Sequence, residues 1–259
     1  MGPLLNLLIF ITTCVIVLNS HSVCGQQRNL KFVDYFRGCN KRQSNFDNCV
    51  KDALNAVRPF FKTGVPEYNI PPFDPFYADE VVQIRGGNNL NYKLKLKNIT
   101  ESGWTLSQVT RFRSDFTKNL IQYTQSFPDK HLSGEYEFVG TMLGRKMYNK
   151  GHWNLSLYDL VQTTTITRKP VKMSSGKINY NTPLKVNVNV QTIKNLSLHI
   201  SNLVRGINFV ETILDRIINS TWEPGFVVTR PLINDLVSTA FTEIFNRSFK
   251  DFDFNILFP

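Results

Sequence analysis

Apolar and polar residues alternate along much of the middle of the chain, which is typical of strands in a sheet with one buried face. The alternation is clear at residues 90–97, 135–138, 153–158 and 184–200. At about 3.3 Å per residue, Leu184–Ile200 would span roughly 50 Å or more as one strand. A strand of that length must coil or bend, so we expect a highly curved antiparallel sheet with a concave apolar face.

Helical spacing replaces this alternation near both ends of the chain. Residues 46–57 are predicted to form a helix with one apolar side, which Ser44 or Asn45 can cap and whose end Pro59 limits. Residues 209–218 carry a second stripe, and the widest stripe is at the C-terminus. It comprises Leu232, Ile233, Leu236, Val237, Ala240, Phe241, Ile244 and Phe245. Pro231 predicts the start of this helix, because a first-turn residue needs no N–H. A helix over Pro231–Phe249 would be roughly 28 Å long.

This order of elements predicts an α+β fold, with a long C-terminal helix packed on the sheet. No linker or low-complexity tract divides the sequence, so we expect a single domain at residues 26–259. Pattern alone leaves open whether the apolar residues between sheet and helix fill a core or line a tunnel. The lining candidates are Leu94, Leu96, Tyr136, Phe138, Trp153, Val186, Val188, Phe209, Phe241 and Phe245.

Residues 1–25 have the features of a secretory signal peptide. Leu4–Leu18 is an apolar run of about 15 residues, which is short for a membrane span, and polar residues follow it. Cleavage after Ser22 or after Gly25 fits the sequence. Five glycosylation sequons support export and predict a secreted, extracellular glycoprotein. They are at Asn98, Asn154, Asn195, Asn219 and Asn246.

Two of the four cysteines belong to the signal region, Cys14 within it and Cys24 at its end. In an oxidising compartment the other two, Cys39 and Cys49, are predicted to pair. A disulfide over so short a loop would fix the N-terminal segment rather than the whole fold. Cleavage after Ser22 would leave Cys24 as an odd thiol.

The sequence has a net charge of +10, with 30 basic and 20 acidic residues. Lysines are spread along the polar sides of strands, as at Lys93, Lys95 and Lys97, and form no basic cluster with interleaved aromatic residues. We therefore expect no nucleic-acid partner. Weak contact with an anionic membrane surface stays open.

Catalytic patterns are missing from the sequence. After the signal region it has three histidines, and it has no Gly-x-Ser-x-Gly elbow, no His-Glu-x-x-His and no phosphate-binding glycine loop. We expect a protein that is not an enzyme and that needs no metal or cofactor.

Four ordered stretches resemble the insect takeout and juvenile-hormone-binding protein family. Cys39 and Cys49 resemble its N-terminal disulfide pair, and GVPEYNIPPFDPF at residues 64–76 resembles its GIPELxIPPLDPL passage. Phe127, Pro128, Leu132, Gly134, Tyr136 and Gly140 resemble its FPxLxIxGxYxxxG passage. The matches to its closing helix and tail are Asn219, Trp222, Pro231, Ile244, Phe245, Asn246, Leu257, Phe258 and Pro259.

Two departures matter for the comparison with this family. Residues 143–151 are more polar than the Leu-Pro-x-x-Gly-x-Gly strand that often follows in the family. The second disulfide of the haemolymph hormone carriers has no counterpart here, which favours the takeout branch and puts juvenile hormone itself in doubt as the ligand.

The resemblance implies a long helix wrapped by a curved antiparallel sheet that encloses a hydrophobic tunnel. It also implies a secreted carrier of a terpenoid, juvenile-hormone-like or fatty-acyl ligand, linked to feeding, circadian or behavioural regulation. Nothing in the sequence demands more than a monomer, so we expect one. Two alternatives remain: a signalling protein that acts on a receptor, with the lipid only structural, and a protein that transfers lipid between membranes.

Overall fold

The structure is a computed structural model that describes residues 31–87, 90–142, 145–169, 171–174, 176, 178–179, 182–202 and 215–248. Contacts divide the chain into Met1–Lys31 and Phe32–Pro259, and the fold below is that of the second unit. The predicted signal peptide, Phe209 and most of the stripe at residues 209–218 lie outside the described residues.

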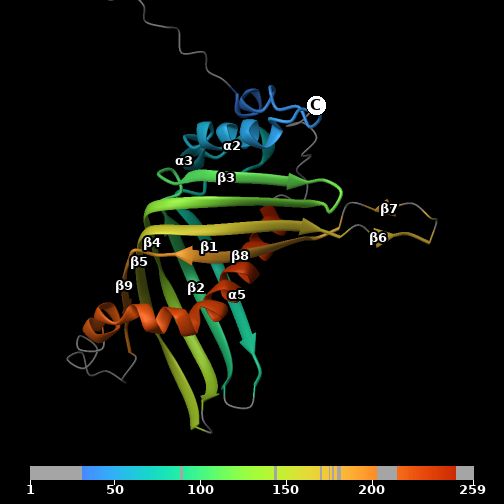
Figure 1. The fold of residues 1–259 in the computed structure, drawn as a ribbon. Helices are drawn as coiled ribbons and strands as arrows, with labels where there is room; N and C mark the ends of the chain where they lie inside the picture. Colours follow the sequence, from blue (N-terminus) through green and yellow to red (C-terminus); the bar gives the residue numbers. More distant parts are fainter. Residues whose placement is uncertain are drawn as a thin grey trace, which may run out of the picture. The chain divides into compact units, whose positions relative to one another are not determined.

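Seven antiparallel strands form the main sheet (Figure 1). Its path is β1-β2-β4-β5-β8, with β3 also paired to β4 and β9 also paired to β5. The strands are β1 (Phe76–Arg85), β2 (Leu90–Ser102), β3 (Gln108–Asp115), β4 (Leu120–Met142), β5 (Arg145–Arg168), β8 (Leu184–Thr192) and β9 (Asn195–Ile200). A separate small sheet joins β6 (Val171–Lys172) to β7 (Ile178–Asn179). The predicted antiparallel sheet is confirmed.

Two long strands, β4 with 23 residues and β5 with 24, pair with each other over nearly their whole lengths, and β2, β3, β8 and β9 pair directly with one of them. Their pairing is interrupted where Pro128 faces Asp159. Proline has no N–H for the ladder, and Asp159 has a φ of 48°. The strands bend in this region (Figure 1), so their two halves pair with different neighbours, β3 and β8 on one side of the bend and β2 and β9 on the other.

The same bend divides the segment that the alternation predicted as one strand, Leu184–Ile200. Strand β8 ends at Thr192 and β9 begins at Asn195. Between them, Lys194 donates its backbone N–H to Tyr158 O at 3.0 Å, and its ammonium group lies 3.3 Å from the Asp159 carboxylate. The prediction of a single strand was wrong. The break is caused by the interruption in β5, the strand with which this segment pairs, and the alternation within residues 184–200 does not reveal it.

The N-terminal part is helical, as predicted for residues 46–57. It comprises η1 (Phe32–Tyr35), α2 (Phe46–Ala56), α3 (Phe60–Thr63) and η2 (Pro66–Tyr68). The structure contains the predicted disulfide between Cys39 and Cys49, with the Cα atoms 5.4 Å apart. Cys39 is buried with Phe36, Phe46 and Val50 in a local core cluster.

The long helix α5 (Trp222–Ser248) confirms the predicted C-terminal helix but corrects its start. Pro231 lies inside the helix, which changes direction part-way along its length (Figure 1). The turns before Pro231 are held by Phe226, which is buried, and by Trp222, whose ring centroid lies 6.0 Å from that of Phe226. Burial of these side chains therefore extends the helix toward the N-terminus, upstream of Pro231, where proline preference alone would start it.

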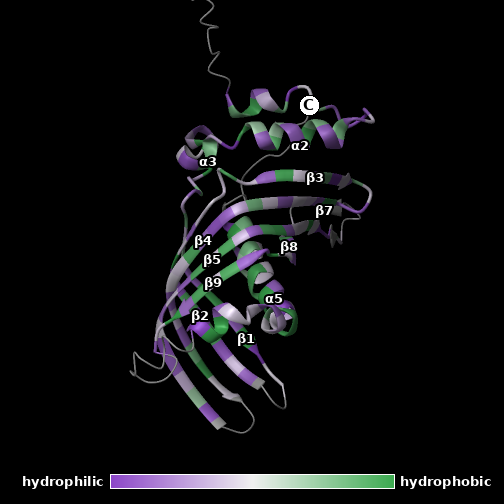
Figure 2. Ribbon diagram, turned by 60° about the vertical axis from the view of Figure 1, so that its left-hand side comes forward, coloured by the Kyte–Doolittle hydropathy of each residue, from purple (hydrophilic) through white to green (hydrophobic). Residues whose placement is uncertain are grey.

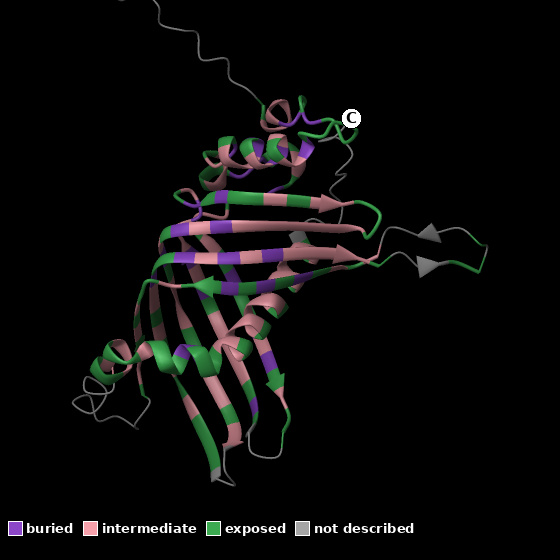
Figure 3. Ribbon diagram, in the orientation of Figure 1, coloured by how far each residue is buried: buried purple, intermediate pink, exposed green. Residues whose placement is uncertain are grey.

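Helix α5 lies against the inner face of the sheet and reaches β1 and β8, the two ends of its main path. On that face Phe127, Leu157, Leu160 and Val190 cluster with side chains of α5 such as Phe226 and Phe241. Figure 2 shows the apolar residues of the strands and helices, and Figure 3 shows buried and exposed positions alternating along β8.

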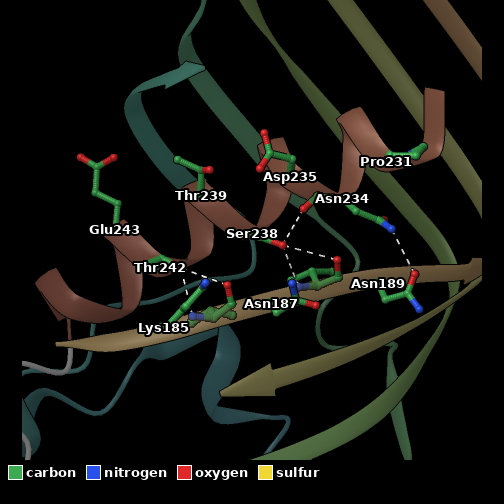
Figure 4. Close-up of a pocket in the computed structure, with 12 residues that line it drawn as sticks. Lys185, Asn187, Asn189, Pro231, Asn234, Asp235, Ser238, Thr239, Thr242 and Glu243 are labelled. Carbon is green, nitrogen blue, oxygen red and sulfur yellow. Dashed lines mark hydrogen bonds between the residues drawn. The ribbon is translucent and has the colours of Figure 1, made fainter. Parts of the chain in front are cut away.

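The edge of β8 is covered by side chains of α5 instead of another strand (Figure 4). Four polar residues spaced four apart on the helix accept hydrogen bonds from backbone N–H groups spaced two apart on the strand. The pairs are Asn246 with Leu184, Thr242 with Val186, Ser238 with Val188 and Asn234 with Val190, at 2.8, 3.0, 2.8 and 3.0 Å. The spacings match, because four helical residues rise about 6 Å and two strand residues span about 6.6 Å. We call this set the β8 seam.

Candidate ligand cavity

An apolar cavity of about 310 Å³ lies between the N-terminal helices, the first half of β4, the end of β5 and the C-terminal part of α5. Aromatic and aliphatic side chains form most of its wall. The lining includes Phe36, Val50, Leu54, Phe61, Phe73, Trp104, Phe112, Ile121, Ile166, Phe241, Ile244 and Phe245. Its composition and size are those of a site for a small hydrophobic molecule.

Helix α2 is held over the cavity by polar side chains that bind the backbone of β3. The Asn55 amide accepts from Val109 N at 2.8 Å and donates to Val109 O at 2.9 Å. Arg58 donates to Ser107 O at 2.7 Å, and the Asp47 carboxylate accepts from Ser114. These contacts leave the apolar side of α2, including Val50 and Leu54, facing the cavity.

The proline-rich passage at residues 64–76 closes another side of the cavity. Its turn needs Gly64, because φ is +69° and a Cβ atom there would lie 2.5 Å from Ile70 O. The Asp74 carboxylate accepts from the N–H groups of Gly103 and Thr105 at 3.0 and 2.6 Å. Burial alone would raise the pKa of Asp74, but hydrogen bonds from Thr105 and Gly103 outweigh it and lower this pKa.

The anchored passage places a chain of aromatic rings along the cavity wall. The ring centroids of Phe61 and Phe73 are 4.2 Å apart, and those of Phe73 and Trp104 are 6.0 Å apart. Trp104 continues the chain to Phe127 at 5.2 Å and to Phe241 of α5 at 5.8 Å.

A few polar groups interrupt this wall. Gln125 donates to the Ser107 hydroxyl at 2.6 Å, and Ser107 donates to Trp104 O at 2.6 Å, so these groups satisfy one another. Tyr123 also lines the cavity. Burial raises the pKa of Tyr123, and its hydrogen bond with Thr164 offsets only part of this effect, so the phenol is neutral.

Behind Trp104 lies a buried ion pair that the sequence did not reveal. Lys130 and Glu101 pair directly, with side chains only 5% and 8% exposed. The ammonium group also lies 4.1 Å from the ring centroid of Trp104 and 3.9 Å from that of Phe127. Burial lowers the pKa of Lys130, while Glu101 opposes this shift. The pair joins β2 to β4 beside the bend.

The predicted lining residues fall into separate places. Phe241 and Phe245 line the cavity. Val186 and Val188 are buried beneath α5, where they border an open groove of about 770 Å³ along the β8 seam. Other groove residues are mostly polar or charged, such as Asn187, Asp235 and Glu243 (Figure 4). This groove is a poor site for an apolar molecule.

Five other candidates are not among the residues that line the cavity: Leu94, Leu96, Tyr136, Phe138 and Trp153. They lie beyond the bend, on strands β2, β4 and β5. There Tyr136 donates to Ser201 O at 2.8 Å, and Phe138 stacks on Tyr92 with centroids 5.4 Å apart. The cavity residues that we missed come mainly from the N-terminal helices, the passage at residues 64–76, β3 and the first half of β4. The apolar side of α2 and the C-terminal stripe that contains Ile244 were local signals for some of them.

The sequon asparagines also differ in their surroundings. Asn98, Asn154 and Asn195 are exposed. Asn219 accepts from Leu198 N at 2.8 Å, and the Asn246 amide group donates to Leu184 O at 2.8 Å and to Thr242 O at 2.7 Å.

The described residues hold neither a metal-binding cluster nor a helix that could span a membrane. Among them, no group of three or more His, Cys, Asp or Glu side chains could hold a metal ion. None of the helices in these parts of the chain is long and apolar enough to cross a bilayer.

Comparison with known proteins decides the family. Residues 11–259 match the family described as haemolymph juvenile hormone binding protein. The chain belongs to this family. Circadian clock-controlled protein daywake from Drosophila melanogaster is 24% identical over 206 residues, covering 76% of this chain and 78% of the relative. The Drosophila yakuba protein of that name is 24% identical over 221 residues, covering 82% and 84%.

A solved structure supports the fold. The crystal structure of Epiphyas postvittana Takeout 1 matches with a TM-score of 0.56 at 18% identity, covering 78% of this chain and 91% of that one. This likeness confirms the α+β architecture of a long C-terminal helix on a large antiparallel sheet, and it agrees with the resemblance found in the sequence.

Proposed function

We propose that the protein is a secreted, non-enzymatic carrier that binds one small hydrophobic molecule in the 310 Å³ cavity. The observation that carries this proposal is the wall of apolar side chains, closed on one side by α2 and on another by α5. Membership of a family described as juvenile hormone binding favours an isoprenoid or fatty-acyl ligand. The likeness to clock-controlled daywake favours a circadian or related regulatory role.

Binding strength follows from the apolar area that a ligand would bury. A chain of about 15 carbons gains about 12 kcal/mol at about 0.8 kcal/mol per methylene. Association and ordering cost at least about 4 kcal/mol. The remaining 8 kcal/mol or so corresponds to a Kd of about 1 μM, which suits a carrier.

The neutral Tyr123 phenol supplies a polar contact that can orient the ligand. It lies in a wall that is otherwise mostly apolar, and its hydrogen bond with Thr164 leaves the phenol oxygen with further capacity to bind a ligand group. A hydroxyl, ester or carboxyl group on the ligand fits this surrounding better than a second apolar end.

Native mass spectrometry of the secreted, deglycosylated protein tests the proposal, followed by organic extraction and identification of the released compound. We expect about one lipid or isoprenoid per chain, and an N-terminus that follows Ser22 or Gly25. Empty protein that also fails to take up fatty acids or isoprenoids at micromolar concentration would contradict the carrier function.

A cavity-filling variant locates the site. Ile121→Trp places a larger side chain in the cavity wall and should lower ligand occupancy at least about tenfold, at a stability cost of about 1–3 kcal/mol. Val227→Trp is the matched control, because Val227 is 64% exposed on α5 and does not line the cavity. Equal occupancy in both variants would place the ligand elsewhere.

A further inference from the structure

One end of the sheet, where the β1–β2 and β4–β5 hairpins turn, combines exposed apolar side chains with unmatched positive charge. A row of directly paired residues crosses four strands there: Ile84 of β1, Lys93 of β2, Val139 of β4 and Tyr148 of β5. Because directly paired residues project to the same face, the four side chains form one surface.

This surface is the outer face of the sheet. Along β1 and β2, the neighbouring positions Gln83 and Tyr92 are buried, and they hydrogen-bond to each other at 2.9 Å. Gln83 also donates to Asp235 of α5 at 2.8 Å, so the helix covers that face. The row on the opposite face is open, with Ile84, Val139 and Tyr148 exposed by 72%, 46% and 54%.

The charge at this end has one sign. Residues 85–97 contain four basic residues and residues 138–150 contain three, and neither segment contains an acidic residue. Lys93, Lys146 and Lys150 are exposed and form no ion pair with another described residue. The nearest acidic side chains on this face are matched: Glu80 to Lys95 at 3.9 Å, and Glu137, which is paired with Lys150 in the strand register, to Lys97 at 3.6 Å.

We propose that the outer face bearing Ile84, Lys93, Val139, Lys146, Tyr148 and Lys150 docks on the surface of an anionic lipid bilayer. Lysines near such a surface are attracted to its phosphate and carboxylate groups. Aliphatic and tyrosine side chains between them can enter the headgroup region, where tyrosine keeps its hydroxyl in water. This combination suits a bilayer better than a protein partner, because the charge has one sign and the apolar groups are spaced singly.

The docking face goes beyond the carrier function. It belongs to the end of the sheet formed by the β1–β2 and β4–β5 hairpins, whereas the cavity is bordered by α2 and β3, which lie toward the other end of β4 and β5 (Figure 1). The carrier would thus touch a bilayer with one end while its ligand lies toward the other.

Co-sedimentation of the secreted protein with vesicles tests this proposal, using phosphatidylcholine alone and phosphatidylcholine with 30% phosphatidylserine. We expect binding only to the anionic vesicles and a strong decrease between 50 and 500 mM salt. The triple variant Lys93→Gln, Lys146→Gln, Lys150→Gln should reduce the partition coefficient roughly 100-fold. Ile84→Thr with Val139→Thr and Tyr148→Thr should reduce it at least about tenfold.

The matched control removes the same charge elsewhere: Arg42→Gln, Arg111→Gln, Arg113→Gln. These arginines are exposed, have no ion pair with a described residue and lie in the N-terminal region or on β3. An equal loss of binding in this control would overturn the proposal in favour of general charge attraction. Equal binding to uncharged vesicles, or none to anionic vesicles, would also overturn it. Ligand content measured in the same variants should stay unchanged, which separates this test from that of the carrier function.

Discussion

The two strands that end the main path of the sheet, β8 and β1, meet α5 in different ways. Strand β8 is joined to the helix by four side-chain-to-backbone pairs along nearly its whole length. Strand β1 meets the helix through Gln83 and Arg85, which both contact the Asp235 carboxylate, at 2.8 and 3.3 Å. The first junction satisfies backbone groups that an edge strand would otherwise expose. The second joins side chains, the buried Gln83 and the partly exposed Arg85 and Asp235, beside apolar packing of Ala78 and Val81 against α5.

This difference indicates which side of the helix is fixed. Losing a contact at the β8 seam leaves a backbone N–H without its partner, and an unsatisfied buried group costs about 1–3 kcal/mol. Losing the ion pair between Arg85 and Asp235 on the β1 side releases groups that water can solvate, since these side chains are 40% and 54% exposed. We expect α5 to remain on β8 and to separate first from β1, which would make the β1 side the route to the interior.

The largest effect should come from removing two central members of the seam. Ser238→Ala with Thr242→Ala deprives Val188 and Val186 of their partners, so we expect the free energy of unfolding to fall by about 2–4 kcal/mol. Chemical denaturation of the secreted protein measures this change.

Thr239→Ala with Glu243→Ala is the control for that pair. Both residues lie one position farther along the same helix, are exposed and have no hydrogen bond to β8 among the described contacts. This variant should change stability by less than about 0.5 kcal/mol. Equal losses in the two double variants would show that helix content, and not the seam, holds α5.

Asn246 allows a second test, because its sequon conflicts with its place in the seam. Its amide nitrogen, the atom that a glycan would modify, donates to Leu184 O and Thr242 O. We therefore expect peptide mapping to find Asn246 unmodified in the folded protein, and Asn154, which is exposed, to be glycosylated.

Substitution of these two asparagines should separate them further. Asn246→Gln should cost about 1–2 kcal/mol of stability, because the longer side chain cannot keep both contacts with Leu184. Asn154→Gln, on the outer face of β5, should change stability by less than about 0.5 kcal/mol. A glycan at Asn246 in stable, folded protein would contradict the role of this residue in the seam.

Some of these features could be predicted from the sequence. The alternation placed Val186 and Val188 on the buried face of β8, and helical spacing placed Phe241 and Phe245 toward the interior. The residues of the seam also had a signal, since Asn234, Ser238, Thr242 and Asn246 recur every fourth position as a polar stripe. We interpreted only the apolar stripe beside it.

Other features depend on partners that are distant in the sequence. The break between β8 and β9 follows from Pro128 facing Asp159, which requires the register of β4 with β5. Whether Leu94 or Ile121 faces a cavity depends on where α2 is anchored, and that is decided by the contacts of Asn55 with Val109. Alternation identifies the face of a strand, but it does not show which part of that face is covered.

The smallest effect tests the comparison most directly, because two adjacent residues of α5 serve the two edges. Asn234 accepts from Val190 N at 3.0 Å on the β8 side, and Asp235 accepts from Gln83 and Arg85 on the β1 side. Asp235→Asn keeps an oxygen for Gln83 and loses only an exposed ion pair, so stability should fall by about 0.2–1 kcal/mol. Asn234→Ala should cost about 1–3 kcal/mol.

If the β1 side is the route to the interior, Asp235→Asn should still speed exchange of a bound fluorescent fatty acid more than Asn234→Ala does. The reverse order in either measurement would place the fixed side of the helix at β1.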